Sequence, residues 1–199
     1  MDTLVLASGN QKKLDEMRAI LEPLALKVVP QSDFQVPEAE ETGLTFVENA
    51  ILKARNAAAH TGLPAIADDS GLEVDALNGA PGIYSARFSG ADASDAKNNA
   101  LLIDMLGDLP DAPRTARSQA VLVLMRHPDA PTPLICQGTW EGEILLAPRG
   151  NGGFGYDPHF LIPELGVTAA EMEPAEKNRI SHRGRALKAL MDALREPPE

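Results

Sequence analysis

The sequence predicts an α/β fold with a mixed sheet and flanking helices, in two lobes around a cleft. Strand-like runs alternate with amphipathic helical patterns along the first half of the chain, which is typical of α/β proteins. Two long strand-like runs then follow each other closely and indicate an antiparallel pair. The chain has 199 residues, of which 44% are hydrophobic, so it can bury a sizeable core.

The N-terminal half is predicted to alternate strands with helices. A strand over residues 3–7 leads into a helix over residues 11–21, in which Leu14, Met17 and Leu21 share one face. The next elements are a strand at 26–30, an acidic loop at 38–43, a helix at 45–60, strand-like runs at 65–67 and 72–77, and a helix at 95–106.

The helix over residues 45–60 has the strongest signal. Thr45 and Glu48 are spaced as a capping box at its start. Its apolar face consists of Val47, Ala50, Ile51, Ala54 and Ala58. Ser94 is a candidate cap for the helix that follows at 95–106.

The C-terminal half is predicted to begin with the antiparallel pair. Its strands cover residues 120–126 and 133–146, and a glycine-rich loop follows at 147–158. Ser181 can cap a last helix, whose apolar residues are Leu187, Leu190, Met191 and Leu194. The tail at 196–199 is expected to be disordered.

Composition excludes several classes of protein. The net charge of −11 argues against a protein that coats nucleic acid with a basic surface. Cys136 is the one cysteine, so no internal disulfide can form and a reducing compartment is expected. We expect no signal peptide and no membrane span, and therefore a cytoplasmic protein.

A turn at residues 8–13 is a candidate phosphate site. A strand ends there and a helix begins, and the free amides at a helix start bind anions. Lys12 and Lys13 lie in the first turn, where the helix dipole disfavours cations unless a ligand compensates. The alternative is a pair of solvated lysines on a surface helix. The spacing of a Walker A loop is absent.

Acidic residues at two places suggest a magnesium site. Glu40 and Glu41 lie in the acidic loop, and the adjacent Asp68 and Asp69 follow a strand. Mg²⁺ takes oxygen ligands, commonly one or two carboxylates together with substrate phosphates and water. Lys53 could add positive charge beside them. One alternative for the aspartates is a turn that caps nearby amides. The alternative for Lys53 is a solvated helix face, which it shares with Asn49, Asn56 and His60.

The glycine-rich loop and the start of the last helix suggest a second binding region. Phe154 and Tyr156 lie among glycines, where an aromatic side chain can stack on a flat ring or pin the loop to the core. Four basic side chains lie close together in sequence near a helix start, which indicates a ligand rich in acceptors. They are Lys177, His182, Arg183 and Arg185.

Five motifs together resemble the Ham1/RdgB family of inosine/xanthosine triphosphate pyrophosphatases. They are SGNQKKLDE, EETGLTFVENAILKAR, AIADDSGLEVDALNGAPGIYSARFSG, GNGGFGYDPHF and EKNRISHRGRAL. The resemblance covers residues 4–194 and is weakest over 91–137, which is interpreted as scaffold. It implies an elongated α/β fold, a single domain over residues 1–199 with a central nucleotide-binding cleft, and a homodimer.

The resemblance also implies Mg²⁺-dependent hydrolysis of ITP, dITP and XTP to the monophosphate and pyrophosphate. It makes Asp69 the general base and a metal ligand together with Glu41, for which Glu40 is the open alternative. The implied substrate contacts are Ser8, Gly9, Asn10, Gln11, Lys12, Lys13, Lys53, Ser70, Phe154, Gly155, Tyr156, Asp157, Lys177, His182 and Arg183.

Within this set, the resemblance places phosphate binding at residues 8–13, with Asn10 and Lys13 as the main contacts. Lys12 lies outside the family's fixed pattern. The resemblance also implies that residues 154–157 stack on the base and that Lys177, His182 and Arg183 recognise it. Two rival functions remain open: a nucleotide sensor without catalysis, and another nucleotide hydrolase such as a Maf-like pyrophosphatase.

Overall fold

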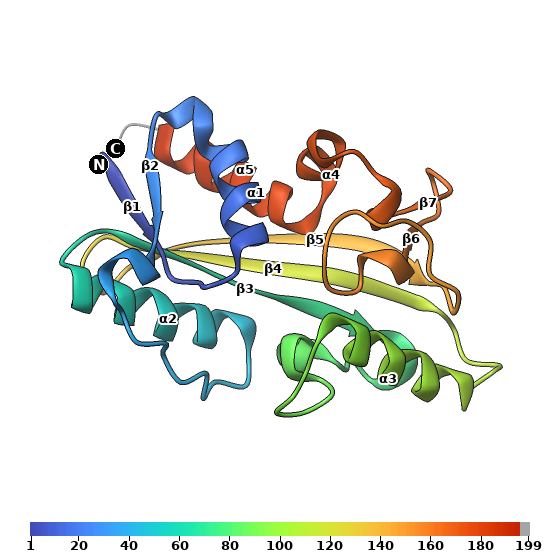
Figure 1. Cartoon of the computed structure of the whole chain (residues 1–199). Helices are drawn as coiled ribbons and strands as arrows, with labels where there is room; N and C mark the ends of the chain where they lie inside the picture. Colours follow the sequence, from blue (N-terminus) through green and yellow to red (C-terminus); the bar gives the residue numbers. More distant parts are fainter. Residues whose placement is uncertain (196–199) are drawn as a thin grey trace. The chain divides into compact units, whose positions relative to one another are not determined.

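The structure, a computed structural model described over residues 1–195, confirms the mixed α/β class (Figure 1). The described strands form a seven-stranded sheet in the order β2-β1-β3-β4-β5-β6-β7. The strands are β1 (Thr3–Leu6), β2 (Lys27–Pro30), β3 (Ala65–Val74), β4 (Thr115–Met125), β5 (Leu134–Ile144), β6 (Phe160–Ile162) and β7 (Val167–Thr168). The α-helices are α1 (Gln11–Leu21), α2 (Phe46–Thr61), α3 (Asp95–Gly107), α4 (Pro174–Ile180) and α5 (His182–Arg195). The tail expected to be disordered, 196–199, lies outside the described residues.

The sheet is mixed, as predicted. Strand β1 pairs in parallel with both β2 and β3, whereas β6 pairs antiparallel with β5 and with β7. The chain divides into two compact units. Unit 1 comprises residues 1–69, 120–138 and 183 onward, and unit 2 comprises 70–119 and 139–182. The cleft expected between two lobes stays a prediction.

In unit 1, the alternation of side chains along β1 separates two apolar clusters. Leu4 and Leu6 pack with apolar residues of α1 and α5. Val5 and Ala7 pack with the alanines of α2. Because successive residues of a strand point to opposite faces, α1 and α5 cover one face of these strands and α2 covers the other (Figure 1).

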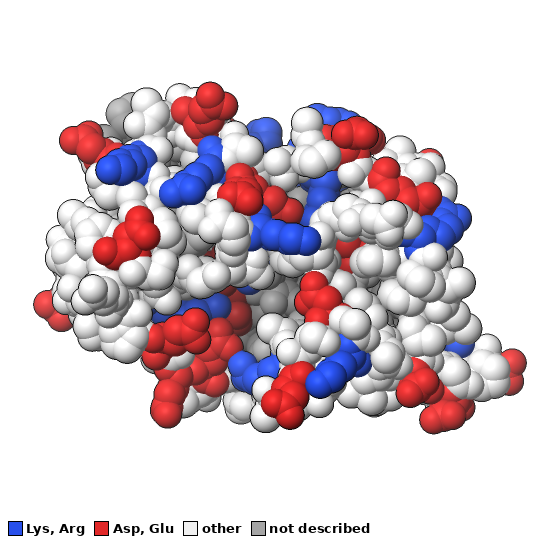
Figure 2. Space-filling model, in the orientation of Figure 1, with Lys and Arg blue, Asp and Glu red and all other residues white. Residues whose placement is uncertain are grey.

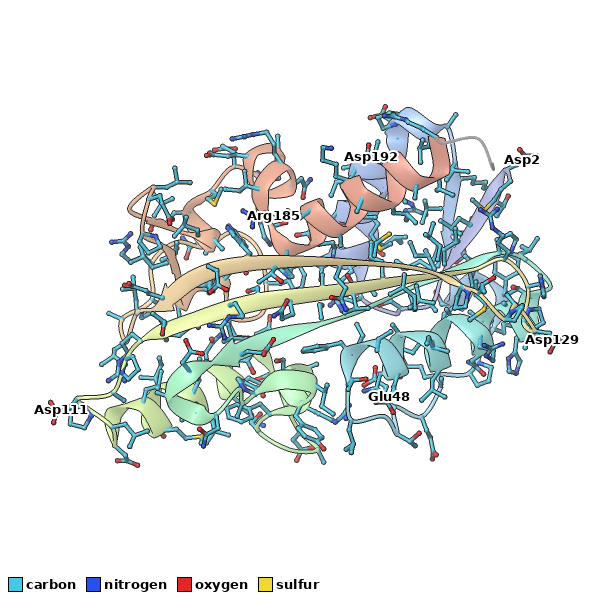
Figure 3. All side chains as sticks on the ribbon, turned by 180° about the vertical axis from the view of Figure 1, so that it is seen from behind. Asp2, Glu48, Asp111, Asp129, Arg185 and Asp192 are labelled. Atoms are coloured by element: carbon cyan, nitrogen blue, oxygen red, sulfur yellow. The ribbon has the colours of Figure 1, made fainter. Side chains whose placement is uncertain are left out.

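Helix α2 begins and ends where the sequence indicates. The Thr45 hydroxyl accepts a hydrogen bond from the Glu48 amide at 3.2 Å and donates to the Glu48 carboxylate at 2.7 Å. Figure 3 labels Glu48 on this first turn. The helix ends at Gly62, whose φ of 67° is in the left-handed region that favours glycine.

In unit 2, one apolar cluster joins α3 to the strands. Leu102 and Leu106 of α3 are fully buried in it, together with Trp140 and Phe160, whose ring centroids are 5.3 Å apart. The helix α4 and the short strands β6 and β7 were not predicted. Strand β6 has three residues, β7 has two and helix α4 has seven. These lengths are too short to give a clear periodic pattern.

The strand β3 is longer than predicted. The sequence suggested two runs separated by a polar turn, but residues 65–74 form one strand in which Asp68 and Asp69 are central. A polar segment can continue a strand when neighbouring strands satisfy its backbone, and β3 lies between β1 and β4. Among residues 1–195, no helix has the length and apolar character to cross a membrane.

Candidate active site

The adjacent aspartates of β3 point to opposite faces of the sheet. Asp68 has the same orientation as Ile66, which packs with α1 and α5, whereas Asp69 has that of Ala67, which packs with α2. The strand therefore separates two carboxylates that are neighbours in sequence, and each meets its own cations.

Asp68 is the acceptor of a buried ion-pair network. Its side chain is 0% exposed, and it accepts hydrogen bonds from Lys13 Nζ at 2.9 Å and from Arg183 Nε at 2.8 Å. Arg183 Nη1 also donates to Glu16 Oε2 at 2.7 Å. Burial alone would raise the pKa of Asp68, but Arg183 and Lys13 outweigh it and hold that pKa well below its ordinary value.

The turn at residues 8–13 starts α1. The Asn10 side chain caps the helix by accepting from the amides of Lys12 and Lys13, and Ser8 Oγ accepts from the Asn10 amide. Gln11 donates to Asp15 on the exposed side of α1. Gly9 and Lys12 are exposed, while Lys13 turns inward to Asp68. The structure thus brings Lys13 into the charged network.

Asp69 meets Lys53 on the other face of the strand. Lys53 Nζ donates to Asp69 Oδ1 at 3.1 Å and to the Asp68 carbonyl at 2.9 Å, and pairs with Glu41 Oε1 at 3.0 Å. Burial opposes the charged ammonium, but Asp69 and Glu41 outweigh it, so the pKa of Lys53 lies above its ordinary value. Burial raises the pKa of Asp69, although Lys53 opposes this.

The second oxygen of Asp69 marks a place for a ligand. Asp69 Oδ2 is buried and makes no hydrogen bond to the part of the chain that the structure describes. A buried carboxylate oxygen without a partner is costly, and a metal ion or a water molecule would satisfy it. Glu41 lies on the same ammonium, whereas Glu40 is exposed, which favours Glu41 as the second carboxylate.

These oxygens fit magnesium better than a metal with a closed protein cage. Within residues 1–195, no group of three or more His, Cys, Asp or Glu side chains could hold a metal ion. Mg²⁺ commonly uses only one or two carboxylates, since substrate phosphates and water complete its coordination. Asp69 and Glu41 supply that number.

The acidic loop is held in place by a residue whose role was missed. Asn49 is 0% exposed; its Oδ1 accepts from the Gly43 amide at 2.8 Å and its Nδ2 donates to the Gly43 carbonyl at 3.3 Å. A Cβ at Gly43 would lie 2.5 Å from Glu48 Cβ, so glycine permits this close approach. Asn49 and Lys53 share a helix face that was also interpreted as solvated, and here both are bound to protein groups.

The loop of residues 154–157 lies in unit 2. Asp157 Oδ2 accepts from the Phe154 amide at 3.1 Å and from Lys177 Nζ at 2.6 Å. The same ammonium is 4.8 Å from the centre of the Phe154 ring, a cation–π distance. Tyr156 packs against the unit 2 core and donates to the Ser85 carbonyl at 2.6 Å. Burial raises the pKa of Tyr156. Tyr156 therefore anchors the loop, and Phe154 is held beside Lys177.

The remaining predicted residues are divided between the units. His182, in unit 2, stacks on Trp140 with ring centroids 6.1 Å apart and planes inclined by 17°. Ser70, also in unit 2, is half-buried on β3. Arg183, in unit 1, is 1% exposed, while Arg185, labelled in Figure 3, is exposed on the same helix. Recognition of the base by His182 and Arg183 stays a prediction.

Basic and acidic side chains are interspersed on the surface drawn in Figure 2, rather than separated into large areas of one sign. The cations of the candidate site are instead paired with carboxylates inside unit 1, since Lys13 and Lys53 are both largely buried. A local cationic site can therefore exist in a protein whose net charge is −11.

Comparison with known proteins identifies the family. A model of the Ham1 family matches residues 4–193. The chain belongs to the Ham1 family. The dITP/XTP pyrophosphatase of Vibrio cholerae is 59% identical over 98% of both chains. That of Escherichia coli K12 is 58% identical over 98% of this chain and 99% of its own.

A solved structure supports the same assignment. The Ham1 protein from Coxiella burnetii is 53% identical and superposes with a TM-score of 0.92, covering 99% of this chain and 100% of its own. Membership of the Ham1 family confirms the resemblance drawn from the five motifs, and the similarity extends through the α3 region that was interpreted as scaffold.

Proposed function

We propose that this chain hydrolyses non-standard purine nucleoside triphosphates, such as ITP, dITP and XTP, to the monophosphate and pyrophosphate. Relatives that match it over nearly their full length are named dITP/XTP pyrophosphatases. The observation that carries the proposal is the ion-paired group of Asp69, Lys53 and Glu41, in which one buried carboxylate oxygen of Asp69 has no hydrogen bond within the described residues.

Asp69 is the proposed general base. Burial raises the pKa of Asp69, which makes its carboxylate a stronger base than an exposed aspartate. A water molecule at Oδ2 would give its proton to Asp69 while its oxygen forms a bond to the α-phosphorus. The bond from the α-phosphorus to the bridging oxygen breaks, and pyrophosphate leaves.

Lys53 and Glu41 support this chemistry. Lys53 holds Asp69 Oδ1, which would leave Oδ2 available to the reacting water. Glu41 and Asp69 would hold Mg²⁺, which neutralises phosphate charge and lowers the pKa of a bound water. The relatives' names state no metal, and the donor chemistry of these two carboxylates supports this part of the proposal.

Lys13 is the proposed phosphate contact at the start of α1. Asn10 fixes the first turn, and Asp68 fixes the ammonium of Lys13 at 2.9 Å. Ser8, Gly9, Gln11 and Lys12 are proposed to complete this turn around the phosphates. A preformed cation costs no reorganisation when the triphosphate binds, which is the reason to hold it with a buried carboxylate.

The base is proposed to stack on the loop of residues 154–157. Hypoxanthine and xanthine present a 6-oxo acceptor, whereas adenine presents a 6-amino donor. Donors from His182, Arg183 or Lys177 would be satisfied by the former and left unpaired by the latter. A site built for one hydrogen bond can reject a ligand that lacks it by ~10⁴-fold or more. Ser70 is the remaining proposed substrate contact.

A substrate panel tests the function. Purified protein is incubated with Mg²⁺ and ITP, dITP, XTP, GTP, ATP or dTTP, and pyrophosphate is scored separately from orthophosphate. We expect IMP and pyrophosphate from ITP in one step. Orthophosphate with accumulating IDP would refute the cleavage position. No turnover would favour a sensor, and preference for dTTP would favour a pyrimidine or Maf-like hydrolase.

We further propose a cytoplasmic homodimer in which the 199 residues act as one catalytic domain. The family model spans most of the chain, which supports the single domain. A substrate pool of free nucleotides supports the location. Sedimentation of the purified protein tests the dimer, since a monomer of 21.2 kDa would contradict it.

A further inference from the structure

Helix α3 holds the backbone of Gly155 from both sides. The Gly155 amide donates to Asp95 Oδ2 at 2.8 Å, and its carbonyl accepts from Asn99 Nδ2 at 2.9 Å. Asp95 and Asn99 are four residues apart, so they lie on the same face of the helix. Both peptide groups of one glycine are thereby bound to a single helix that is 60 residues and 56 residues away in sequence.

The glycine held in this way determines the path of the loop. Gly153 and Gly155 both have positive φ, 65° and 61°, so they are turning points on either side of Phe154. A Cβ at Gly153 would lie 2.1 Å from Asp157 Oδ2, the oxygen that holds the Phe154 amide. The orientation of the Phe154 ring therefore depends on the peptide planes on its two sides, one of which α3 holds.

Helix α3 is a rigid support. Its Leu102 and Leu106 are fully buried, and Ser94 caps its first turn by accepting from the Lys97 amide. Asn98 is buried and donates to the carbonyl of Ser85, the same carbonyl that accepts from Tyr156. Helix α3 therefore contacts the loop directly at Gly155, and it also binds the Ser85 carbonyl to which Tyr156 of the loop donates.

The side-chain amide of Asn99 uses its Nδ2 donor to contact the loop. Its Oδ1 is buried and has no hydrogen-bond partner among the described residues. A buried acceptor without a partner costs free energy, and turning the amide would direct that oxygen at the Gly155 carbonyl. Asn99 therefore makes the hydrogen bond from Nδ2 to the Gly155 carbonyl and leaves Oδ1 without a partner among the described residues.

We propose that Asp95 and Asn99 are positioning residues that orient Phe154 for stacking on the substrate base. The inference rests on the proposed function, since it takes residues 154–157 as the base-stacking loop. It assigns α3, which was interpreted from the sequence as scaffold, to substrate discrimination. No substrate atom needs to contact Asp95 or Asn99 for this role.

Four variants of the full chain test the proposal. Asp95→Ala and Asn99→Ala each remove one bond to Gly155, and Asp95→Asn retains an acceptor. Asp104→Ala changes an exposed aspartate of the same helix and is the matched control. The readouts are hydrogen exchange of the peptide that contains residues 150–157, and kinetic constants for dITP and dATP.

We expect faster exchange in this peptide for both alanine variants, and wild-type exchange for Asp104→Ala. The kcat/KM for dITP should fall about 3- to 10-fold in each of the variants Asp95→Ala and Asn99→Ala, mainly through a higher KM. The reason is that each variant loses one hydrogen bond to the loop, while the phosphate chemistry is intact. The preference for dITP over dATP should fall with it. Asp95→Asn should restore most of the loss.

Two results would overturn the proposal. One is unchanged exchange of residues 150–157 in both alanine variants. The other is an equal fall in kcat for dITP and dATP, which would indicate general destabilisation of the protein. Hydrogen exchange needs no substrate, so it tests the attachment of the loop even if wild-type protein fails to hydrolyse dITP, a failure that would refute the proposed function instead.

Discussion

Replacement of Asp68 by asparagine tests the buried ion-pair network most directly. Asp68→Asn keeps the shape of the side chain but removes the charge that faces both Lys13 and Arg183. Arg183 retains its ion pair with Glu16, whereas Lys13 loses its ion pair with Asp68. Removal of one partner from a buried pair destabilises a protein by about 3–5 kcal/mol. For a chain of this size, that is a fall in Tm of roughly 6–20 °C.

The pH dependence of the same variant gives a second test. The pKa of Asp68 is lower in the folded protein than in the unfolded chain, so its contribution to stability is present at neutral pH. It is lost as pH falls from about 4, the ordinary value of an aspartate, through the lower pKa of the folded state. The difference in stability between wild type and Asp68→Asn should therefore be full at pH 7 and shrink in acid.

The assay is thermal unfolding followed by circular dichroism at pH 7 and at a series of lower values. Asp192→Asn is the control, because Asp192 is an exposed residue of α5 (Figure 3) whose pair with Lys188 contributes at most about 0.5 kcal/mol. Wild-type Tm in Asp68→Asn at pH 7 would refute the network as a source of stability. A difference that persists unchanged into acid would refute its electrostatic origin.

Three further predictions concern activity and metal binding. Asp69→Asn should remain folded and lose at least ~10²-fold in turnover, and the rise of activity with pH through the pKa of Asp69 should disappear; near-normal turnover would remove it from the mechanism. Lys13→Ala should lower kcat/KM for every triphosphate by a similar factor. Arg183→Lys keeps the charge beside Asp68 but should reduce the ratio of kcat/KM for ITP to kcat/KM for ATP. An equal fall in kcat/KM for ITP and ATP in Arg183→Lys would mean that other residues recognise the base. Asn49→Ala should weaken the binding of Mn²⁺, used in place of Mg²⁺ and measured by calorimetry, by about tenfold, because the loop that carries Glu41 would lose its two hydrogen bonds to Asn49. An unchanged affinity for Mn²⁺ would exclude a role of Asn49 in positioning Glu41.

Local patterns in the sequence were sufficient to predict several elements of the fold. The capping residue Thr45, the apolar face of α2 and the strand that begins at Thr3 all depend on neighbours within a few positions, so propensity and periodicity were enough to predict them. The five motifs together were sufficient to predict the family, which the match to the Ham1 family model confirms.

Contacts between residues that are distant in sequence could not be predicted from local patterns. Asp68 and Arg183 are 115 positions apart, and whether they pair depends on the face of β3 from which Asp68 projects. That face followed from the continuation of the strand through the polar residues, which local patterns had suggested was a turn. The attachment of Gly155 to α3 likewise joins residues 60 and 56 positions apart, through backbone atoms that every residue type carries. A backbone contact leaves no mark in the identity of Gly155 other than its tolerance of positive φ, and so the packing of the chain, rather than its local pattern, assigns Asp95 and Asn99 their place.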